Sequence, residues 1–318
     1  MLKNTAEQPV ADKLLKSFLA ISLSLTFLLL SIGVSNAEIM EVAREDRGRT
    51  IYLRPEIHWP PGTGPFGVVI VVNSSAGPKD AFLTVSIEPL TKAGIAVATL
   101  DTFTPRDVQA TAVNQKLVSS TQMALDALFV AEALRRNSRV RPDKIALQGQ
   151  SKGGVTALHA ATEGWRQFVR TTKQPFDATI AMAPSCELQF RDPMLVSPLF
   201  ALMGEKDDNT LPGPCVKLFE RMKSAGQPVV WEVVEGANHA WSTYGSYLSP
   251  NLFSIRNCAD EPYYYTRKGF ESSLTGQVIA FRQIFSRCGA RGYMIGGSHD
   301  KRPYVLERAV KWLKGMGW

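Results

Sequence analysis

A serine between glycines is the first feature of this sequence with chemical meaning. Gly149-Gln150-Ser151-Lys152-Gly153 fits the pattern G-x-S-x-G. Where this pattern carries a reactive serine, the chain turns sharply from a strand into a helix, and the serine oxygen stands clear at the edge of the sheet. Glycines are needed there because a Cβ atom would collide with the neighbouring strand or helix. We therefore predict that Ser151 is a nucleophile.

Two histidines are candidates for the base that a serine nucleophile needs. His239 follows the apolar run 229–234, which predicts the last strand of a sheet. His299 lies just before the pattern of the last helix. In the chain order serine, acid, histidine, the base follows the last strand. We therefore favour His239 and keep His299 as the alternative.

Two adjacent aspartates are candidates for the acid that orients the imidazole and stabilises its charged form. Asp207 and Asp208 follow the apolar run 199–203, where the acid is expected. Adjacent side chains point in different directions, so only one of the two can serve. We favour Asp207.

Two backbone N–H groups are expected to stabilise an oxyanion. One belongs to Lys152, the residue after the nucleophile. The other should come from the loop 73–77, which follows the first long apolar run, and we assign it to Ser75. This chemistry needs no metal or organic cofactor, and the cysteine spacings do not resemble a zinc site.

The elements that must position these residues are predicted by alternating patterns. Short apolar runs predict strands at 66–72, 95–100, 145–148, 179–183, 199–203 and 229–234. Helical patterns occupy 82–92, 115–136, 154–168, 216–224 and 304–314. Such alternation predicts an α/β fold with a mostly parallel central sheet and helices on both faces. The carboxyl ends of parallel strands meet at one edge, where the candidate residues would converge.

The stretch 242–302 interrupts this alternation before the last helix. It is aromatic, contains the run Tyr263–Tyr265, and is too long for a structureless loop in a compact domain. We expect an insertion with its own helix near 270–285. Because it begins just after His239, it should form a lid that shapes the substrate pocket.

The cysteines predict two disulfides. Cys186, Cys215, Cys258 and Cys288 are the four cysteines of the chain. An even number in an exported protein favours pairing, although four cysteines allow three connectivities. We favour Cys186–Cys215, which would join two loops at the carboxyl edge of the sheet. Cys258–Cys288 would then close the insertion on itself.

Residues 1–37 have the pattern of a secretory signal peptide. The start is basic, 17–34 is uncharged and apolar, and Ser35 and Ala37 are small residues at the positions a signal peptidase reads. The mature domain 38–318 would then be exported, to the periplasm or the medium. A retained membrane anchor is the alternative, because about 18 apolar residues can just span a bilayer.

Composition and charge indicate which kinds of molecule the protein binds. The chain has 318 residues, of which 45% are hydrophobic and 20% charged, as in ordinary globular proteins. The net charge of +7 comes from scattered basic residues without runs of like charge, which argues against nucleic-acid binding. We expect a small-molecule substrate and no stable membrane span after the signal is removed.

The serine motif, the candidate acid and base, and the segments around them together resemble the dienelactone hydrolase family of α/β-hydrolases. The matching segments are 68–77, 93–97, 101–106, 141–154, 204–208 and 236–240. The resemblance implies the α/β-hydrolase fold and the cleavage of esters or lactones through an acyl-enzyme. Ser151 replaces the cysteine of the members that gave the family its name, and Asn73-Ser74 replaces a frequent His-Gly.

These departures favour an ester or lactone hydrolase over a true dienelactone hydrolase. A peptidase or acyltransferase with the same triad is one alternative. A binding protein on a non-catalytic hydrolase scaffold is the other.

Overall fold

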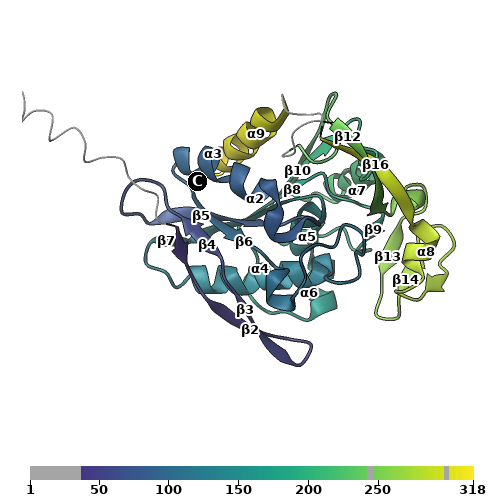
Figure 1. Cartoon of the computed structure of the whole chain (residues 1–318), viewed down its shortest axis with the longest axis horizontal. Coiled ribbons are helices and arrows are strands. Elements are labelled where there is room, and N and C mark those ends of the chain that lie inside the picture. Colours follow the sequence, from purple (N-terminus) through teal and green to yellow (C-terminus); the bar gives the residue numbers. More distant parts are fainter. Residues whose placement is uncertain (1–36, 242–245, 297–300) are drawn as a thin grey trace, which may run out of the picture. The chain divides into compact units, whose positions relative to one another are not determined.

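The computed structural model describes residues 37–241, 246–296 and 301–318 (Figure 1). The alternative base His299 and residues 1–36 of the predicted signal peptide lie outside the described residues. In the described part, no helix combines the length and the apolar character that a membrane crossing requires.

An eight-stranded sheet is the centre of the described domain, with the strand order β1-β4-β6-β5-β7-β8-β10-β11. Its strands are β1 (Glu38–Ile39), β4 (Glu56–His58), β5 (Phe66–Val72), β6 (Ala96–Leu100), β7 (Val140–Gln150), β8 (Ala178–Met182), β10 (Leu199–Gly204) and β11 (Val229–Val234). From β6 to β11 all neighbours pair in parallel, whereas β4 runs antiparallel to β1 and β6. The predicted α/β fold with a mostly parallel sheet is therefore confirmed.

Helices cover both faces of this sheet. Their bounds are α2 (Ala81–Val85), α3 (Ile87–Lys92), α4 (Ser120–Leu134), α5 (Lys152–Ala160), α6 (Glu163–Val169), α7 (Pro212–Ser224) and α9 (Lys301–Gly315). Figure 1 shows α3 and α9 on one side of the sheet and α4 and α6 on the other. Along β5, Val68 and Ile70 face the core beneath α4, whereas Val69 and Val71 face the core beneath α9. Burial on both faces explains why this strand is a continuous apolar run.

Two of the predicted helices are each divided into two. The helix expected at 82–92 breaks at Ser86, whose hydroxyl donates to the carbonyl oxygen of Phe82. The helix expected at 154–168 breaks before Thr162, whose side chain accepts the N–H of Trp165 and caps α6. Serine and threonine form such local bonds at the expense of continuous helix.

The described part of the stretch between β11 and α9 is built mainly of strands. β12 (Ser246–Ser254) pairs with β16 (Ala290–Gly296), and β13 (Tyr263–Tyr265), β14 (Phe270–Ser272) and β15 (Val278–Ile279) form a small sheet with β9 (Leu188–Gln189). The prediction of a helix at 270–285 is wrong, because only α8 (Ile284–Cys288) is helical there. The side chain of Ser272 accepts N–H groups of the turn that follows it, and Gly276 adopts φ +70°, which closes a hairpin instead.

A hairpin near the start of the described residues was not predicted. β2 (Val42–Asp46) and β3 (Arg49–Leu53) pair antiparallel around a turn in which Arg47 and Gly48 both have positive φ. Buried charges tie this hairpin to the core. Arg44 on β2 and Arg106, after β6, both form ion pairs with Asp46 and with Asp126 of α4.

Candidate active site

Ser151 occupies a strained turn between β7 and α5. Its backbone angles are φ 57° and ψ −119°, a conformation that residues other than glycine avoid. A Cβ on Gly149 would lie 2.4 Å from the backbone of Gly153, and one on Gly153 would lie 2.9 Å from the carbonyl oxygen of Asn73. The glycines of the pattern are therefore required by close backbone contacts, and the turn exposes the serine to a cavity.

The three residues predicted as a triad lie together at the carboxyl edge of the sheet. Asp207 follows β10 and His239 follows the neighbouring strand β11. The Nε2 atom of His239 is 2.9 Å from Oγ of Ser151, and its Nδ1 atom is 2.7 Å from Oδ2 of Asp207. With Nδ1 protonated toward the carboxylate, Nε2 can accept the serine proton.

The two candidate acids have different partners. The carboxylate of Asp207 accepts the backbone N–H groups of Asn209 and Thr210 at 2.9 and 2.8 Å, and the hydroxyl of Thr210 at 2.8 Å. These bonds fix the carboxylate that faces the imidazole. Asp208 points away and accepts the backbone N–H of Met294 on β16.

Sequence reasoning did not assign two further residues around the imidazole. Nδ2 of Asn209 is 3.0 Å from Nε2 of His239, so it meets the same nitrogen as the Ser151 hydroxyl. Oγ1 of Thr210 is 3.2 Å from the other ring nitrogen. Their place two and three residues after Asp207 was the available signal, but polar residues in a turn are too common to identify a site.

The backbone N–H groups of Ser75 and Lys152 can donate to an oxyanion. Both residues line the cavity that Ser151 enters. Within the described part of the chain neither N–H has an acceptor. Lys152 is the first residue of α5, where backbone N–H groups have no partner within the helix.

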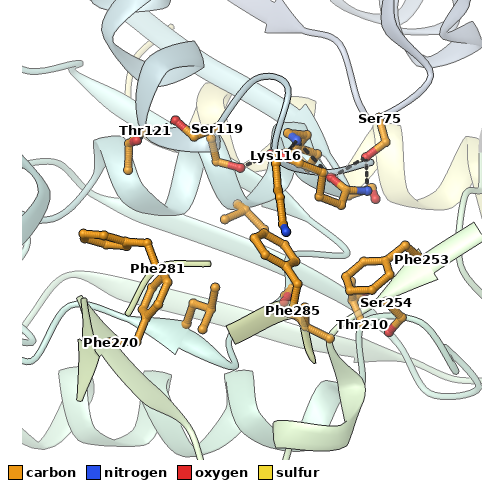
Figure 2. A pocket seen from close by; sticks show the side chains of 18 of the residues that line it. Ser75, Lys116, Ser119, Thr121, Thr210, Phe253, Ser254, Phe270, Phe281 and Phe285 are labelled. Atoms are coloured by element: carbon orange, nitrogen blue, oxygen red, sulfur yellow. Dashed lines mark hydrogen bonds between the residues drawn. The ribbon is translucent and has the colours of Figure 1, made fainter. Parts of the chain in front are cut away.

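The cavity has a volume of about 470 Å³ and two unlike sides. Figure 2 shows the polar side chains of Ser75, Ser119 and Thr121 on one side, and phenyl rings on the other. The aromatic lining residues after β11 are Phe253, Tyr265, Phe270, Phe281, Phe285 and Tyr293. The stretch 246–296 therefore supplies most of the apolar wall.

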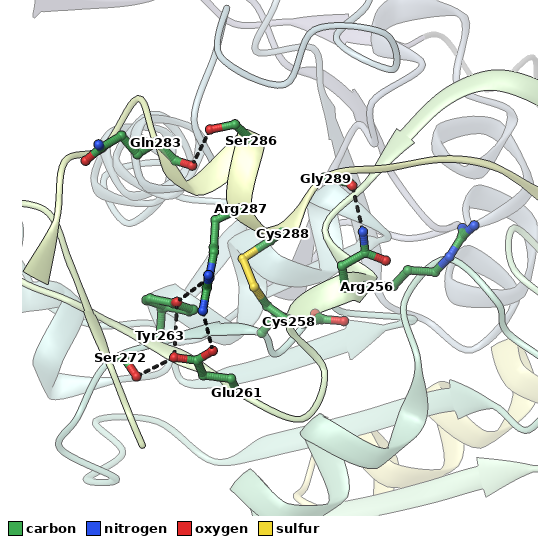
Figure 3. Close-up of a disulfide and its surroundings, with 12 residues drawn as sticks. Arg256, Cys258, Glu261, Tyr263, Ser272, Gln283, Ser286, Arg287, Cys288 and Gly289 are labelled. Atoms are coloured by element: carbon green, nitrogen blue, oxygen red, sulfur yellow. Dashed lines mark hydrogen bonds and ion pairs between the residues drawn. A yellow bond between two sulfur atoms is a disulfide. The ribbon is translucent and has the colours of Figure 1, made fainter. Parts of the chain in front are cut away.

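All four cysteines are paired in the described residues. The Cys186–Cys215 bond joins the loop after β8 to α7, and the Cys258–Cys288 bond joins η3 (Arg256–Cys258) to α8. These are the pairs favoured from the sequence. Figure 3 shows polar contacts beside the second bond, where Arg287 and Ser272 both donate to the carboxylate of Glu261.

Two buried titratable side chains lie near the triad. Burial lowers the pKa of Lys152 to about 7. Burial also raises the pKa of Glu187 to about 7, and the neighbouring charge of Asp207 acts in the same direction. No cluster of three or more potential metal-ligating His, Cys, Asp or Glu side chains occurs in the described ranges.

Comparisons with known proteins reveal a shared fold. No protein-family model and no curated protein matches the sequence. Esterase 2 of Thermogutta terrifontis, phosphoramylated by tabun, matches with a TM-score of 0.50 and 17% identity, over 66% of this chain and 86% of that chain. The same esterase phosphonylated by cyclosarin matches with a TM-score of 0.50 and 19% identity, over the same shares.

A putative dienelactone hydrolase from Klebsiella pneumoniae also matches, with a TM-score of 0.49 and 17% identity, over 65% of this chain and 90% of that chain. At these identities the likeness concerns the fold. The described domain therefore has the α/β fold of a solved esterase, with a serine, a histidine and an aspartate in hydrogen-bonded series at its carboxyl edge.

Proposed function

We propose that this protein is an exported serine hydrolase that cleaves carboxylic esters or lactones of small molecules. The observation that carries the proposal is the series of contacts from Ser151 through His239 to Asp207, at 2.9 and 2.7 Å, beside a cavity with an apolar wall. The fold of an esterase supports it.

In this mechanism Oγ of Ser151 attacks the ester carbonyl while Nε2 of His239 takes its proton. Asp207 stabilises the imidazolium, and the N–H groups of Ser75 and Lys152 bind the oxyanion. Collapse of the tetrahedral intermediate breaks the ester bond, and the imidazolium gives its proton to the leaving alcohol. Water then attacks the acyl-enzyme with His239 as the base, which releases the acid and regenerates Ser151.

Export is supported by two independent features. The start of the sequence combines a basic segment, an apolar run and a small-x-small end. The disulfides Cys186–Cys215 and Cys258–Cys288 require an oxidising compartment in most organisms.

The test is a panel of p-nitrophenyl esters of increasing acyl length, run beside simple lactones. A fluorophosphonate probe serves as a second readout, because it labels an activated serine without regard to the natural substrate. We expect hydrolysis and labelling by the wild type. Ser151→Ala should lower kcat by roughly 10⁴-fold or more and abolish labelling, because triad members act as a unit.

The fold of the variant should be unchanged, which circular dichroism and thermal unfolding check. Full activity of folded Ser151→Ala protein would contradict the assignment of the nucleophile. Failure of the wild type to react with either ester or probe would instead favour a non-catalytic binding protein.

A further inference from the structure

The side chain of Lys152 is buried beside the site without a carboxylate partner in the described residues. Its Nζ atom lies 3.1 Å from Oγ1 of Thr111, 3.1 Å from the carbonyl oxygen of Gln115 and 2.9 Å from Oε1 of Gln115. An ammonium group has three donors, so these acceptors satisfy it fully. Burying a charge is costly unless it is bonded in this way.

Thr111 and Gln115, which accept hydrogen bonds from Lys152, also donate hydrogen bonds to Ser75. Nε2 of Gln115 donates to Oγ of Ser75 at 3.0 Å, and the backbone N–H of Thr111 donates to the Ser75 carbonyl oxygen at 2.9 Å. Figure 2 shows the hydrogen bonds that converge on the Ser75 side chain. The loop at Ser75 is therefore fixed at both its hydroxyl and its carbonyl by one short segment.

The N–H groups of Lys152 also favour one orientation of the Gln115 amide. Lysine donates through its N–H groups whether it is charged or neutral, and the amide oxygen of Gln115 accepts from Nζ at 2.9 Å. The amide nitrogen is then the nearer of the two amide atoms to Oγ of Ser75, at 3.0 Å against 3.3 Å for the oxygen. An apolar residue in place of Lys152 would leave the amide free to turn and would release the segment 111–115 from α5.

We propose that the Lys152 side chain is a positioning residue of the oxyanion hole, which acts through Gln115 on the loop that carries Ser75. This rests on the proposed function. The backbone of Lys152 supplies one N–H donor, and its side chain reaches across to set the place of the other, that of Ser75. The distance between the N–H groups of Ser75 and Lys152 is thereby fixed before a substrate binds.

Displacement of the Ser75 N–H should destabilise the transition state more than the bound substrate. Full negative charge on the oxygen exists only after the serine has attacked, so a displaced donor weakens that state more than the bound ester. A positioning role predicts a lower kcat with KM nearly unchanged. Simple loss of pocket charge or of packing predicts a change in KM or in stability instead.

The experiment compares Lys152→Met, Gln115→Leu, the double variant and Lys152→Arg on one p-nitrophenyl ester. Removal of one oxyanion donor costs about 10²–10³-fold in kcat, so its displacement should cost about 10- to 100-fold. We expect this loss in both single variants, with KM within about 3-fold. The double variant should be no worse than the singles, because both break one chain of contacts. Lys152→Arg should recover part of kcat.

Lys79→Met is the matched control, since Lys79 is an exposed lysine just after the Ser75 loop. It should leave kcat unchanged. Thermal unfolding checks each variant, and Gln115→Leu keeps the test available if Lys152→Met does not fold.

Unchanged kcat in folded Lys152→Met or Gln115→Leu, a change confined to KM, or additive losses in the double variant would overturn the inference. Those results would leave the proposed function intact if the wild type still hydrolyses esters and reacts with the fluorophosphonate. A wild type that does neither would overturn both.

Discussion

The side chains of Asp207 and Asp208 leave the backbone in different directions and are bound by different partners. Asp207 contacts His239, whereas Asp208 accepts the N–H of Met294 and so holds β16. Asp207→Asn should lower kcat about 10⁴-fold with the fold intact, because the amide favours the wrong tautomer of the imidazole. Asp208→Asn should keep kcat within about 10-fold, because it loses only a contact to β16. Steady-state kinetics on one ester tests both, and greater damage from Asp208→Asn would exchange their roles.

Glu187 should make stability depend on pH. Burial raises its pKa from the ordinary 4.5 to about 7. Between these values the unfolded chain has released the proton that the native protein still holds, so the free energy of unfolding falls as pH rises. Glu187→Gln cannot ionise. The free energy of unfolding of the wild type relative to this variant should therefore drop by up to about 3 kcal/mol from pH 4.5 to 7.5.

Urea unfolding of both proteins across that pH range measures the difference. The nearby charge of Asp207 belongs to both proteins and largely cancels in the comparison. Parallel stability curves would show that Glu187 is already ionised in the native state near pH 5.

The sequence indicated Ser151 and His239 because each follows a predicted strand in a fixed order along the chain. It did not indicate Asn209, Glu187 or the side-chain role of Lys152. Their positions near the site depend on which polar atoms the folded chain brings within hydrogen-bond distance. No local pattern in the sequence carries that information.

Among the elements, the core strands were the easiest to predict. β5 was predicted to the residue at 66–72, because a run buried on both faces is continuously apolar and ends at small residues. The segment 270–285 was predicted wrongly. The prediction used only the length of the stretch, which does not distinguish a helix from a hairpin. Apolar residues such as Phe270 and Ile279 belong to a local hairpin packed against α8.

The aromatic wall should control which acyl groups fit. Phe281 lines the cavity and is 41% exposed, so its removal should not unfold the domain. Phe281→Ala should shift the ratio of kcat/KM values for long against short acyl esters by about 10-fold, since burial of a few methylenes contributes roughly 1–3 kcal/mol. The p-nitrophenyl ester panel measures this ratio.

Leu274→Ala is the matched control, because Leu274 is exposed on the same stretch and does not line the cavity. Its ratio should equal that of the wild type. An unchanged ratio in Phe281→Ala would mean that the acyl group binds elsewhere in the cavity.

For the molecule as a whole, the fold class followed from the alternation of strands and helices between 66 and 234. The β2–β3 hairpin did not. Its strands alternate between buried and exposed residues, but buried Arg44 and Asp46 hide that pattern by placing charges on the inward face. These charges are buried because they form an ion-paired cluster with Arg106 and Asp126.

The two disulfides should stabilise different parts of the molecule. Cys258 and Cys288 close a loop of 30 residues within the stretch after β11, and packing around them is local. Loss of such a bond lowers the free energy of unfolding by roughly 3–4 kcal/mol through loop entropy. We expect only this stretch to be destabilised. The double variant Cys258→Ser, Cys288→Ser should therefore still hydrolyse short esters but lose selectivity for acyl length.

The matched variant removes the other bond. Cys186 and Cys215 lie within the main core, next to Glu187 and near the turn that carries Asp207. Cys186→Ser, Cys215→Ser should therefore lower the melting temperature of the whole domain and reduce activity on every ester of the panel together. Thermal unfolding combined with the panel separates the two patterns. Equal loss of selectivity in both variants would mean that the stretch after β11 and the core unfold as one unit.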